Sequence, residues 1–265
     1  DVTESKLAEQ ALFKSEERLR LSLKAANQGL YDLNIQTGEA IVNDEYALML
    51  GFDPKTFNES NSYWIERLHP DESEITAKAY RDYIAGKTSE YKVEFRQRTK
   101  NDEWKWILSI GKIVEYDSSG KPLRMLGTHT DISNIKEAEA ELLKLSQAIK
   151  QSPTSILITN PKGEIEYVNP KFTEITGYTI DEMLGQNPNI LKSGHTTDIE
   201  YKKIWEEIIS GKEWFGEFCN RKKNGELYWE AASISPIFNN KGEISNFVSV
   251  TQDITERKHL LAEII

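Results

Sequence analysis

The chain has 265 residues, enough for two domains of roughly 100–150 residues each. Hydrophobic residues make up 38% and aromatic residues 10%, which suffices for two ordinary cores and is too much for an intrinsically disordered chain. Lys and Arg number 33 against 43 Asp and Glu. The resulting net charge of −10 repels phosphate backbones, so we expect no nucleic-acid partner.

Cysteine usage and hydropathy indicate the compartment. Cys219 is the single cysteine, which excludes an internal disulfide and favours a reducing compartment. No apolar run approaches the ~20 residues that a membrane span needs, and the N-terminus lacks a signal-peptide pattern. We therefore expect a cytoplasmic chain with no direct membrane insertion in this segment.

The first predicted element is a signalling helix over residues 1–26. Its apolar stripe is irregular and runs through Leu12, Leu19, Leu23 and Ala26. Such a stripe either packs on the sheet of its own domain or contacts a second copy of the chain as a coiled coil.

Residues 27–133 and 151–255 are predicted to be two copies of one domain. The sequence repeats itself with a period of about 120–126 residues, the signature of duplicated structural units. The matching positions, first copy before second, are Asn43 and Asn169, Gly51 and Gly177, Glu94 and Glu217, Trp106 and Trp229, and Asp131 and Asp253.

Each copy reads as two strands, then short helices, then three strands. In the second copy, alternation and turn residues predict strands over 155–159, 165–169, 214–221, 227–237 and 244–252. Helices are predicted over 172–177, 180–184 and 201–209. Helices grouped between the second and third strands predict an α+β fold, with a five-stranded antiparallel sheet in each domain and short helices on one face.

A linker helix is predicted over residues 134–150, between the two copies. Its apolar residues are spaced by three and four positions in turn, which is typical of a coiled-coil seam. We therefore expect a homodimer held in part by this helix, although the same stripe could pack on its own domain. The seam residues are Ile135, Ala138, Leu142, Leu145 and Ile149.

Each copy ends where a helix begins, and the second of these is the start of an output helix over residues 256–265. Asp253 is predicted to be its N-cap, with Glu256 three residues later completing a capping box. Asp131 takes the same part in the first copy. We predict that Asp131, Asp253 and Glu256 relay distortions of the sheet to the following helix.

These motifs resemble the PAS superfamily over nearly the whole chain, from about residue 15 to residue 258. The closing stretches 131–133 and 253–258 are similar to the terminal PAC signature of that family. The first copy is similar to the subgroup that carries Trp64 followed by His69, Pro70 and Asp71. The second resembles the subgroup with the stretches 169–170, 176–178, 185–188, 191–194, 214–217 and 220–225.

The resemblance implies a tandem PAS sensor module with no output enzyme of its own. Relatives of this kind lie upstream of a histidine kinase or diguanylate cyclase in the same polypeptide, as in two-component systems. They commonly work as dimers and sense small ligands, redox state or light. We accordingly expect no catalytic residues in this chain, and the motif search gives none.

The second copy resembles flavin-binding PAS domains, both the blue-light LOV type and the FAD redox sensors. The resemblance places Pro188 at the photoreactive cysteine of the LOV type, so no sulfur–flavin adduct can form there. Glu230 and Thr251 stand where two further amides are expected. The implied cofactor-binding residues are Asn187, Leu191, Lys192, Trp205, Asn220, Trp229, Glu230 and Thr251.

FAD in the second domain, another small ligand and no cofactor at all remain open from the sequence. The alternative function is therefore a cofactor-free dimerisation and relay scaffold. In the first copy Trp64, Tyr91, Trp104 and Trp106 either line a pocket or belong to the core. The four histidines are scattered and lack metal-ligand spacing, so no metal site is expected.

Overall fold

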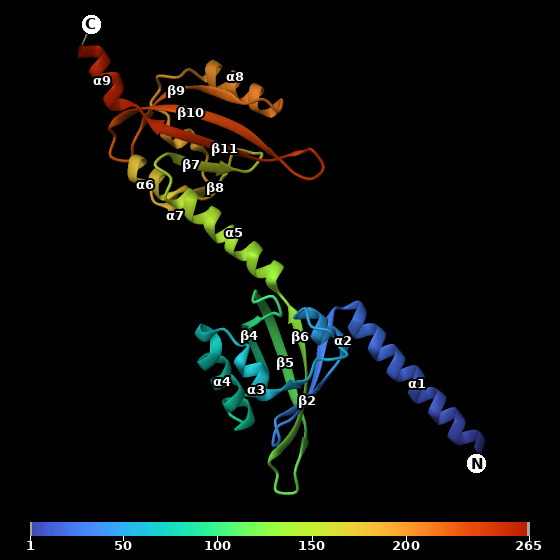
Figure 1. Cartoon of the computed structure of the whole chain (residues 1–265). Helices are drawn as coiled ribbons and strands as arrows, with labels where there is room; N and C mark the ends of the chain where they lie inside the picture. Colours follow the sequence, from blue (N-terminus) through green and yellow to red (C-terminus); the bar gives the residue numbers. More distant parts are fainter. Residues whose placement is uncertain (1, 264–265) are drawn as a thin grey trace. The chain divides into compact units, whose positions relative to one another are not determined.

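The computed structural model describes residues 2–263; residues 1, 264 and 265, at the ends of the predicted first and output helices, lie outside the described residues. The chain divides into two compact units, one up to Ala140 and one from Glu141 onward (Figure 1). Among residues 2–263, no helix is both long and apolar enough to cross a membrane.

The first unit opens with helix α1 (Val2–Ala25) and contains a six-stranded antiparallel sheet. The strands follow the spatial order β3-β2-β1-β6-β5-β4. They are β1 (Gln28–Asn34), β2 (Glu39–Val42), β3 (Glu59–Ser60), β4 (Tyr91–Arg98), β5 (Trp104–Tyr116) and β6 (Pro122–Asp131). The inserted helices are α2 (Asp44–Met49), α3 (Asn61–Glu66) and α4 (Pro70–Ile84).

Helix α5 (Ser133–Lys150) leads into the second unit, whose five-stranded antiparallel sheet has the order β8-β7-β11-β10-β9. The strands are β7 (Ser155–Thr159), β8 (Ile165–Val168), β9 (Trp214–Arg221), β10 (Leu227–Phe238) and β11 (Ile244–Asp253). The helices are α6 (Pro170–Thr176), α7 (Ile180–Met183), the 3₁₀ helix η1 (Pro188–Leu191), α8 (Asp198–Ile209) and α9 (Thr255–Glu263).

The predicted α+β class is confirmed, with two local differences. The first sheet gains the two-residue edge strand β3, which pairs with β2 and carries Glu59, a buried partner of the Arg67 guanidinium. Helix α8 begins earlier than its apolar face suggested. Thr197 and Glu200 form a capping box at its start, so the helix begins at Asp198 rather than at the predicted Tyr201.

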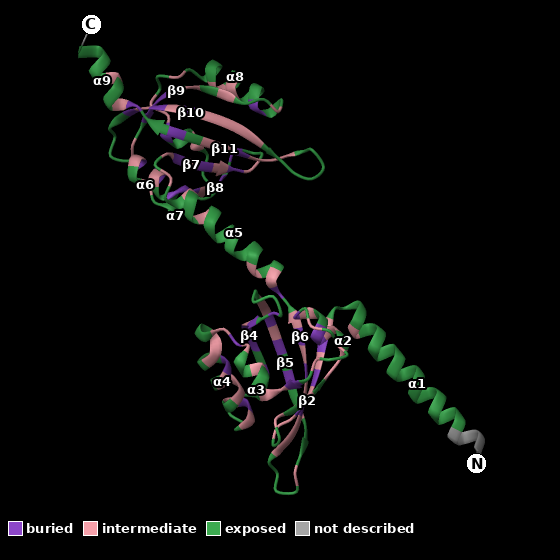
Figure 2. Ribbon diagram, in the orientation of Figure 1, coloured by how far each residue is buried: buried purple, intermediate pink, exposed green. Residues whose placement is uncertain are grey.

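Burial follows the strands rather than the connecting helices. Figure 2 shows buried residues along the strands of both sheets, whereas α1 and α5 are exposed over most of their length. No residue of α5 is buried. An amphipathic helix without a covered face gains little from its own domain, so its apolar side chains remain available to another surface.

The same asparagine joins the sheet to the first inserted helix in both units. Asn43 caps α2 and Asn169 caps α6, each accepting a backbone N–H with its side-chain oxygen. Asn169 is fully buried, and its amide donates to two further carbonyls while its oxygen accepts a second N–H. Its backbone partners are Phe172 N, Ile156 N, Thr154 O and Ile149 O.

We predict that Asn169→Ala destabilises the second unit by about 3 kcal/mol, because several buried backbone groups lose their partner. Hydrogen exchange of β7 and β8 amides measures the loss, with β1 amides as the reference in the same sample. Asn240→Ala, in an exposed turn, is the matched control and should change nothing. Equal protection in the two variants would contradict this role.

Candidate functional site

A cavity of about 530 Å³ lies in the second unit, between the inner face of its sheet and the segment that contains η1 and α8. Strands β7, β9, β10 and β11 all contribute to its wall. Alternate residues of a strand point to the same face, so each strand contributes residues spaced by two, such as Phe247, Ser249 and Thr251 of β11. The volume lies in the range typical of small-molecule sites, about 300–1,000 Å³. The cavity can therefore hold a cofactor-sized ligand.

The buried end of the cavity is polar. Asn220, Glu230 and Thr251 come from the neighbouring strands β9, β10 and β11, and all three are buried. Asn220 Nδ2 donates to Glu230 Oε1 at 2.8 Å. Burial raises the pKa of Glu230 to about 7, although hydrogen bonding by Thr251 and Asn220 opposes the rise. These groups offer both donors and acceptors to the polar edge of a ligand.

The wall of the cavity also carries basic side chains. Lys162, Lys192 and Lys202 all line it, and Glu230 is the single acidic residue among the residues that form its wall. Lys192 Nζ lies 3.9 Å from the centre of the Tyr201 ring. Three lysines in the wall of one cavity give it a positive charge that suits an anionic group on a ligand.

Aromatic side chains form another part of the cavity wall. Trp205 packs on Phe247 with 5.4 Å between ring centroids. Tyr201 stacks on Phe218 at 5.8 Å with the rings nearly parallel, 7° apart. Flat apolar walls of this kind favour a planar ring system over a flexible chain.

Asn187 fixes the position of η1 over the cavity. Its Nδ2 donates to the Gly163 carbonyl at 3.1 Å, and its oxygen accepts from Asn189 N at 3.0 Å. A Cβ on Gly163 would lie 3.0 Å from that Nδ2, and the glycine has a φ of +80°. The positive φ therefore favours glycine in this turn, and a side chain there would crowd the Asn187 amide.

Seven of the eight predicted cofactor residues line this one cavity: Asn187, Leu191, Lys192, Trp205, Asn220, Glu230 and Thr251. Trp229 does not, because it is adjacent to Glu230 on β10 and therefore faces the other side of the sheet. The sequence prediction missed Lys162 and Lys202. Their charge was the available signal, but lysines in a turn and on a helix usually face solvent.

Trp229 instead lies at the junction where β11 passes into α9. Ile254 N donates to Trp229 O at 2.8 Å, and Trp229 N donates to Thr255 Oγ1 at 2.9 Å. Asp253 Oδ1 in turn accepts from Thr255 N at 2.9 Å. The backbone N–H and C=O of one β10 residue are thus both tied to the residues that start the exit helix.

The first unit repeats this junction. Ile132 N donates to Trp106 O at 2.9 Å, and Trp106 N donates to Ser133 Oγ at 3.1 Å. Asp131 Oδ1 accepts from Ser133 N at 2.9 Å. The two units therefore share the same contact between the strand and the exit helix, built from a tryptophan, an aspartate and a hydroxyl residue.

A lysine on each exit helix adds a second connection to the sheet. Lys258 Nζ lies 2.5 Å from Glu217 and 4.9 Å from the centre of the Trp229 ring. The matching contacts in the first unit join Lys136 to Glu94 at 2.6 Å and to the Trp106 ring at 5.5 Å. The first turn of each exit helix is therefore attached to the sheet that precedes it.

The predicted capping box at the start of the output helix is wrong in its detail. β11 extends to Asp253, and the backbone N–H of Ile254 is held by Trp229, so α9 begins only at Thr255. Asp253 lies two residues before the helix and binds Thr255. In the described part of α9, Glu256 makes no hydrogen bond to Asp253.

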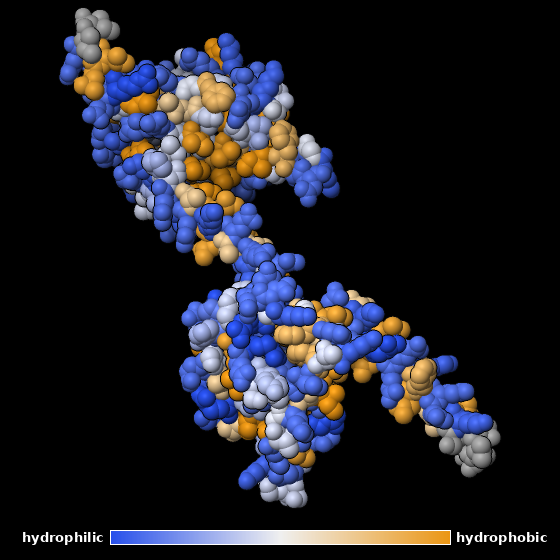
Figure 3. All heavy atoms as spheres, viewed as in Figure 1, coloured by the Kyte–Doolittle hydropathy of each residue, from blue (hydrophilic) through white to orange (hydrophobic). Residues whose placement is uncertain are grey.

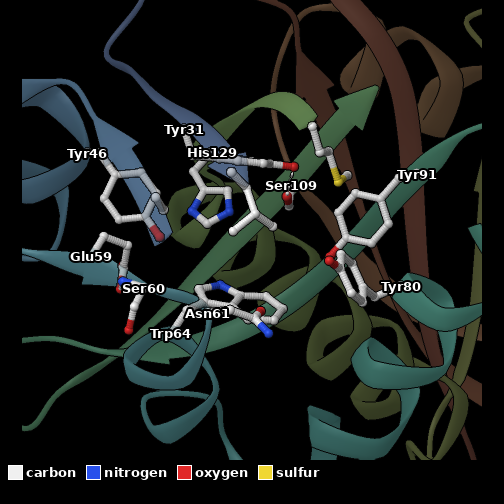
Figure 4. Close-up of a pocket in the computed structure, with 13 residues that line it drawn as sticks. Tyr31, Tyr46, Glu59, Ser60, Asn61, Trp64, Tyr80, Tyr91, Ser109 and His129 are labelled. Atoms are coloured by element: carbon white, nitrogen blue, oxygen red, sulfur yellow. Dashed lines mark hydrogen bonds between the residues drawn. The ribbon is translucent and has the colours of Figure 1, made fainter. Parts of the chain in front are cut away.

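The first unit contains a much smaller cavity, about 40 Å³, with predominantly aromatic walls (Figure 4). The ring of His129 stacks on Tyr46 with centroids 4.8 Å apart, and it meets Tyr31 edge-on at 5.1 Å. Burial lowers the pKa of His129 to about 3, so the imidazole is neutral near pH 7. This interior has space for a few water molecules at most.

Two of the four aromatic residues predicted for this pocket, Trp64 and Tyr91, line the small cavity. Trp106 belongs to the helix junction, and Trp104 packs on His69 with ring centroids 4.6 Å apart. His69 also lies near two carboxylates. Both bind the guanidinium of Arg96, with Glu72 at 2.5 Å and Asp71 at 3.1 Å, so this cluster is an ion-pair network.

Comparisons with known proteins match both units. A family model described as "PAS domain" covers residues 153–256, and one described as "PAS fold" covers residues 39–129. A nitrogen fixation regulatory protein of Klebsiella oxytoca is 31% identical over 107 residues, 40% of this chain and 22% of that protein. A blue-light-activated histidine kinase of Brucella canis is 34% identical over 121 residues, 44% of this chain and 24% of the kinase.

Among solved structures, a sensory box histidine kinase/response regulator from Burkholderia thailandensis superimposes with a TM-score of 0.46 at 26% identity. It covers 51% of this chain and 99% of that one. The chain spans less than a quarter of the length of the two curated relatives named above.

We predict that Asp253→Ala loosens the start of α9 by about 1 kcal/mol, because Thr255 N loses its acceptor. Hydrogen exchange should show faster exchange in the first turn of α9 and unchanged protection in β10. Asp131→Ala, the equivalent change in the first unit, should affect only the start of α5. Unchanged exchange in α9 would show that the carboxylate does not hold this helix.

Proposed function

This chain consists of two PAS domains in tandem, and on that premise we propose that it is a redox-sensing module with FAD bound in the second domain. PAS domains are sensor domains of regulatory proteins and have no catalytic activity of their own. We place the two domains at residues 27–133 and 151–255. The effector that reads the signal, a kinase or cyclase, lies outside these domains in the same polypeptide.

The observation that carries the proposal is the polarity of the large cavity. A flavin has a planar ring with a polar pyrimidine edge and, in FAD, a pyrophosphate far from that edge. The cavity offers buried polar groups, aromatic walls, and the exposed lysines Lys162 and Lys202. Bound FAD would supply reversible electron transfer.

The residues that line the cavity have distinct parts in holding this cofactor. Asn220 and Glu230 bind the pyrimidine edge, and Trp205 with Phe247 contacts the ring face. Leu191 and Asn187 close the cavity through η1. Lys192 is set by its contact with Tyr201 and adds a positive charge to the cavity wall.

Redox sensing is favoured over light sensing by the position of the thiol. The named relatives include both a nitrogen fixation regulator and a blue-light-activated kinase. In this chain Pro188 lines the cavity, and Cys219 does not belong to its wall. Cys219 lies on β9 between two residues that face the cavity, so its own side chain points to the opposite face.

The signal leaves the site along β11. Thr251 lines the cavity, and two residues later Asp253 holds the start of α9. A changed hydrogen bond at the buried end shifts β11 against β10, and the Trp229 junction transfers that shift to the helix. Glu256 lies in the first turn of the same helix.

The first domain serves as relay and dimerisation unit. Its cavity of about 40 Å³ is too small for a flavin ring, and its interior is filled by stacked aromatic side chains. It nevertheless keeps the same junction to its exit helix, through Asp131 and Trp106. A domain that keeps the output connection but has so little space beside its inner aromatic side chains is suited to pass on movement.

We assign the homodimer contact to α5. Leu142 and Leu145, three apart on the predicted seam, are 67% and 55% exposed. The second domain offers a further apolar area over β7 and β11, where Val248 pairs with Ile158 and Val250 with Ile156 (Figure 3). Burying such surface is favoured by about 25 cal/mol per Å².

Freshly purified protein should therefore show a flavin absorption spectrum, and FAD should be released by heat. Asn220→Ala should lose most of the flavin because one of the buried polar groups is removed. Asn240→Ala is the matched control and should keep it. A colourless wild-type protein that also fails to bind added FAD would favour the cofactor-free scaffold.

The dimer should dissociate when charge is placed on the seam. Leu142→Glu is expected to shift the mass measured by light scattering from two chains to one, because two like charges meet at the contact. Leu260→Glu, also an exposed helical leucine, is the control and should leave the dimer intact. A dimeric Leu142→Glu protein would place the interface elsewhere.

A further inference from the structure

Glu230 is a buried acid that has no basic partner. Glu230 is 8% exposed. Among residues 2–263, no Lys, Arg or His forms an ion pair with its carboxyl group. Its recorded hydrogen bond comes from the neutral amide of Asn220. A buried carboxylate without a cation is costly, so such a group tends to keep its proton.

The surroundings of Glu230 reinforce this tendency. On β11, Asp253 is its directly opposite neighbour and adds a like charge, and Thr251 lines the cavity beside it. Tyr228 on the same strand and Tyr201 on α8 are neutral phenols near pH 7. Lys192 also lines the cavity, but its Nζ is placed over Tyr201 and 3.3 Å from Asp198.

A protonated carboxyl has the same hydrogen-bonding pattern as a primary amide. It presents one donor and one acceptor side by side, whereas a carboxylate presents acceptors only. The adjacent C=O and N–H groups of a lactam or imide ring need such a donor–acceptor pair. An ionised Glu230 would leave a ligand carbonyl facing a negative oxygen, which is repulsive.

We propose that Glu230 in its acid form recognises the lactam edge of the ligand, so that the second domain binds its ligand together with a proton. The inference rests on the proposed flavin site and adds to it the chemistry of one residue. It also explains how an acid can stand where the resemblance led us to expect an amide.

Asn220 sets the direction of this carboxyl. Because Asn220 Nδ2 donates to Oε1, that oxygen must remain an acceptor, and the proton resides on Oε2. Oε2 then donates to the ligand carbonyl, while the second lone pair of Oε1 accepts the ligand N–H. One neighbouring amide therefore fixes which oxygen is the donor.

The test compares FAD affinity as a function of pH in the full chain and in its Glu230→Gln variant. In the wild type, affinity should fall by about tenfold per pH unit above the titration of Glu230, because the competent acid form becomes rarer. Glu230→Gln should bind with an affinity that changes little between pH 6 and 8.5, because its amide keeps a donor and an acceptor at every pH.

Calorimetry of FAD binding in buffers of different ionisation enthalpy gives a second readout on the unmodified protein. Near pH 7.5 the wild type should take up a fraction of a proton for each FAD bound, and Glu230→Gln should take up none. Proton uptake in the wild type supports the inference even if the variant folds poorly.

Three results decide between the inferences. Wild-type affinity that falls with pH, together with a flat Glu230→Gln profile, supports the acid form as the recognition group. Equal pH profiles in the two proteins, or no proton uptake by the wild type, overturn it and leave the flavin site standing. Failure of the wild type to bind FAD at any pH overturns the proposed function, and this inference with it.

Discussion

The pairing of β10 with β11 is the interaction on which both the site and its connection to the helix depend. It places Glu230 and Thr251 at the buried end of one cavity, and it continues without interruption to Asp253. The last hydrogen bond of that region, from Ile254 N to Trp229 O, determines where α9 begins. Because a ladder of backbone hydrogen bonds is stiff, a shift of β11 beside the cavity would also displace the start of α9.

The two domains show that this connection and the ligand space are independent properties of the fold. Both keep the tryptophan, the aspartate and the lysine of the helix junction. They differ where side chains point inward: Ile107 in the first domain matches Glu230, and His129 matches Thr251. Tyr46 and Tyr31 then fill the space around His129, and the volume falls from about 530 to about 40 Å³. The side chains on the inner face therefore set the size of the cavity beside the sheet.

The sequence was sufficient for the fold, since its repeat and its alternation predicted the order of strands and helices in both copies. It was less reliable at single residues. Trp229 and Glu230 were both assigned to the cofactor, yet neighbours on a strand cannot face one cavity. Lys162 and Lys202 were missed because only the folded chain brings a turn and a helix into the wall of the same cavity. The start of α9 was misjudged because a backbone bond to Trp229 on β10, as well as the local contact of Asp253 with Thr255, sets it.

The buried acid has a further consequence through the register of the strands. Glu230 lies directly opposite Asp253, the residue that holds Thr255 at the start of α9. When Glu230 loses its proton, two negative charges face each other across one rung of the ladder, and the repulsion acts on the carboxylate that orders the helix. A glutamine at this position would bind a lactam edge equally well, but it carries no charge and so could not repel Asp253. The acid therefore connects occupancy, protonation and helix order within two neighbouring strands.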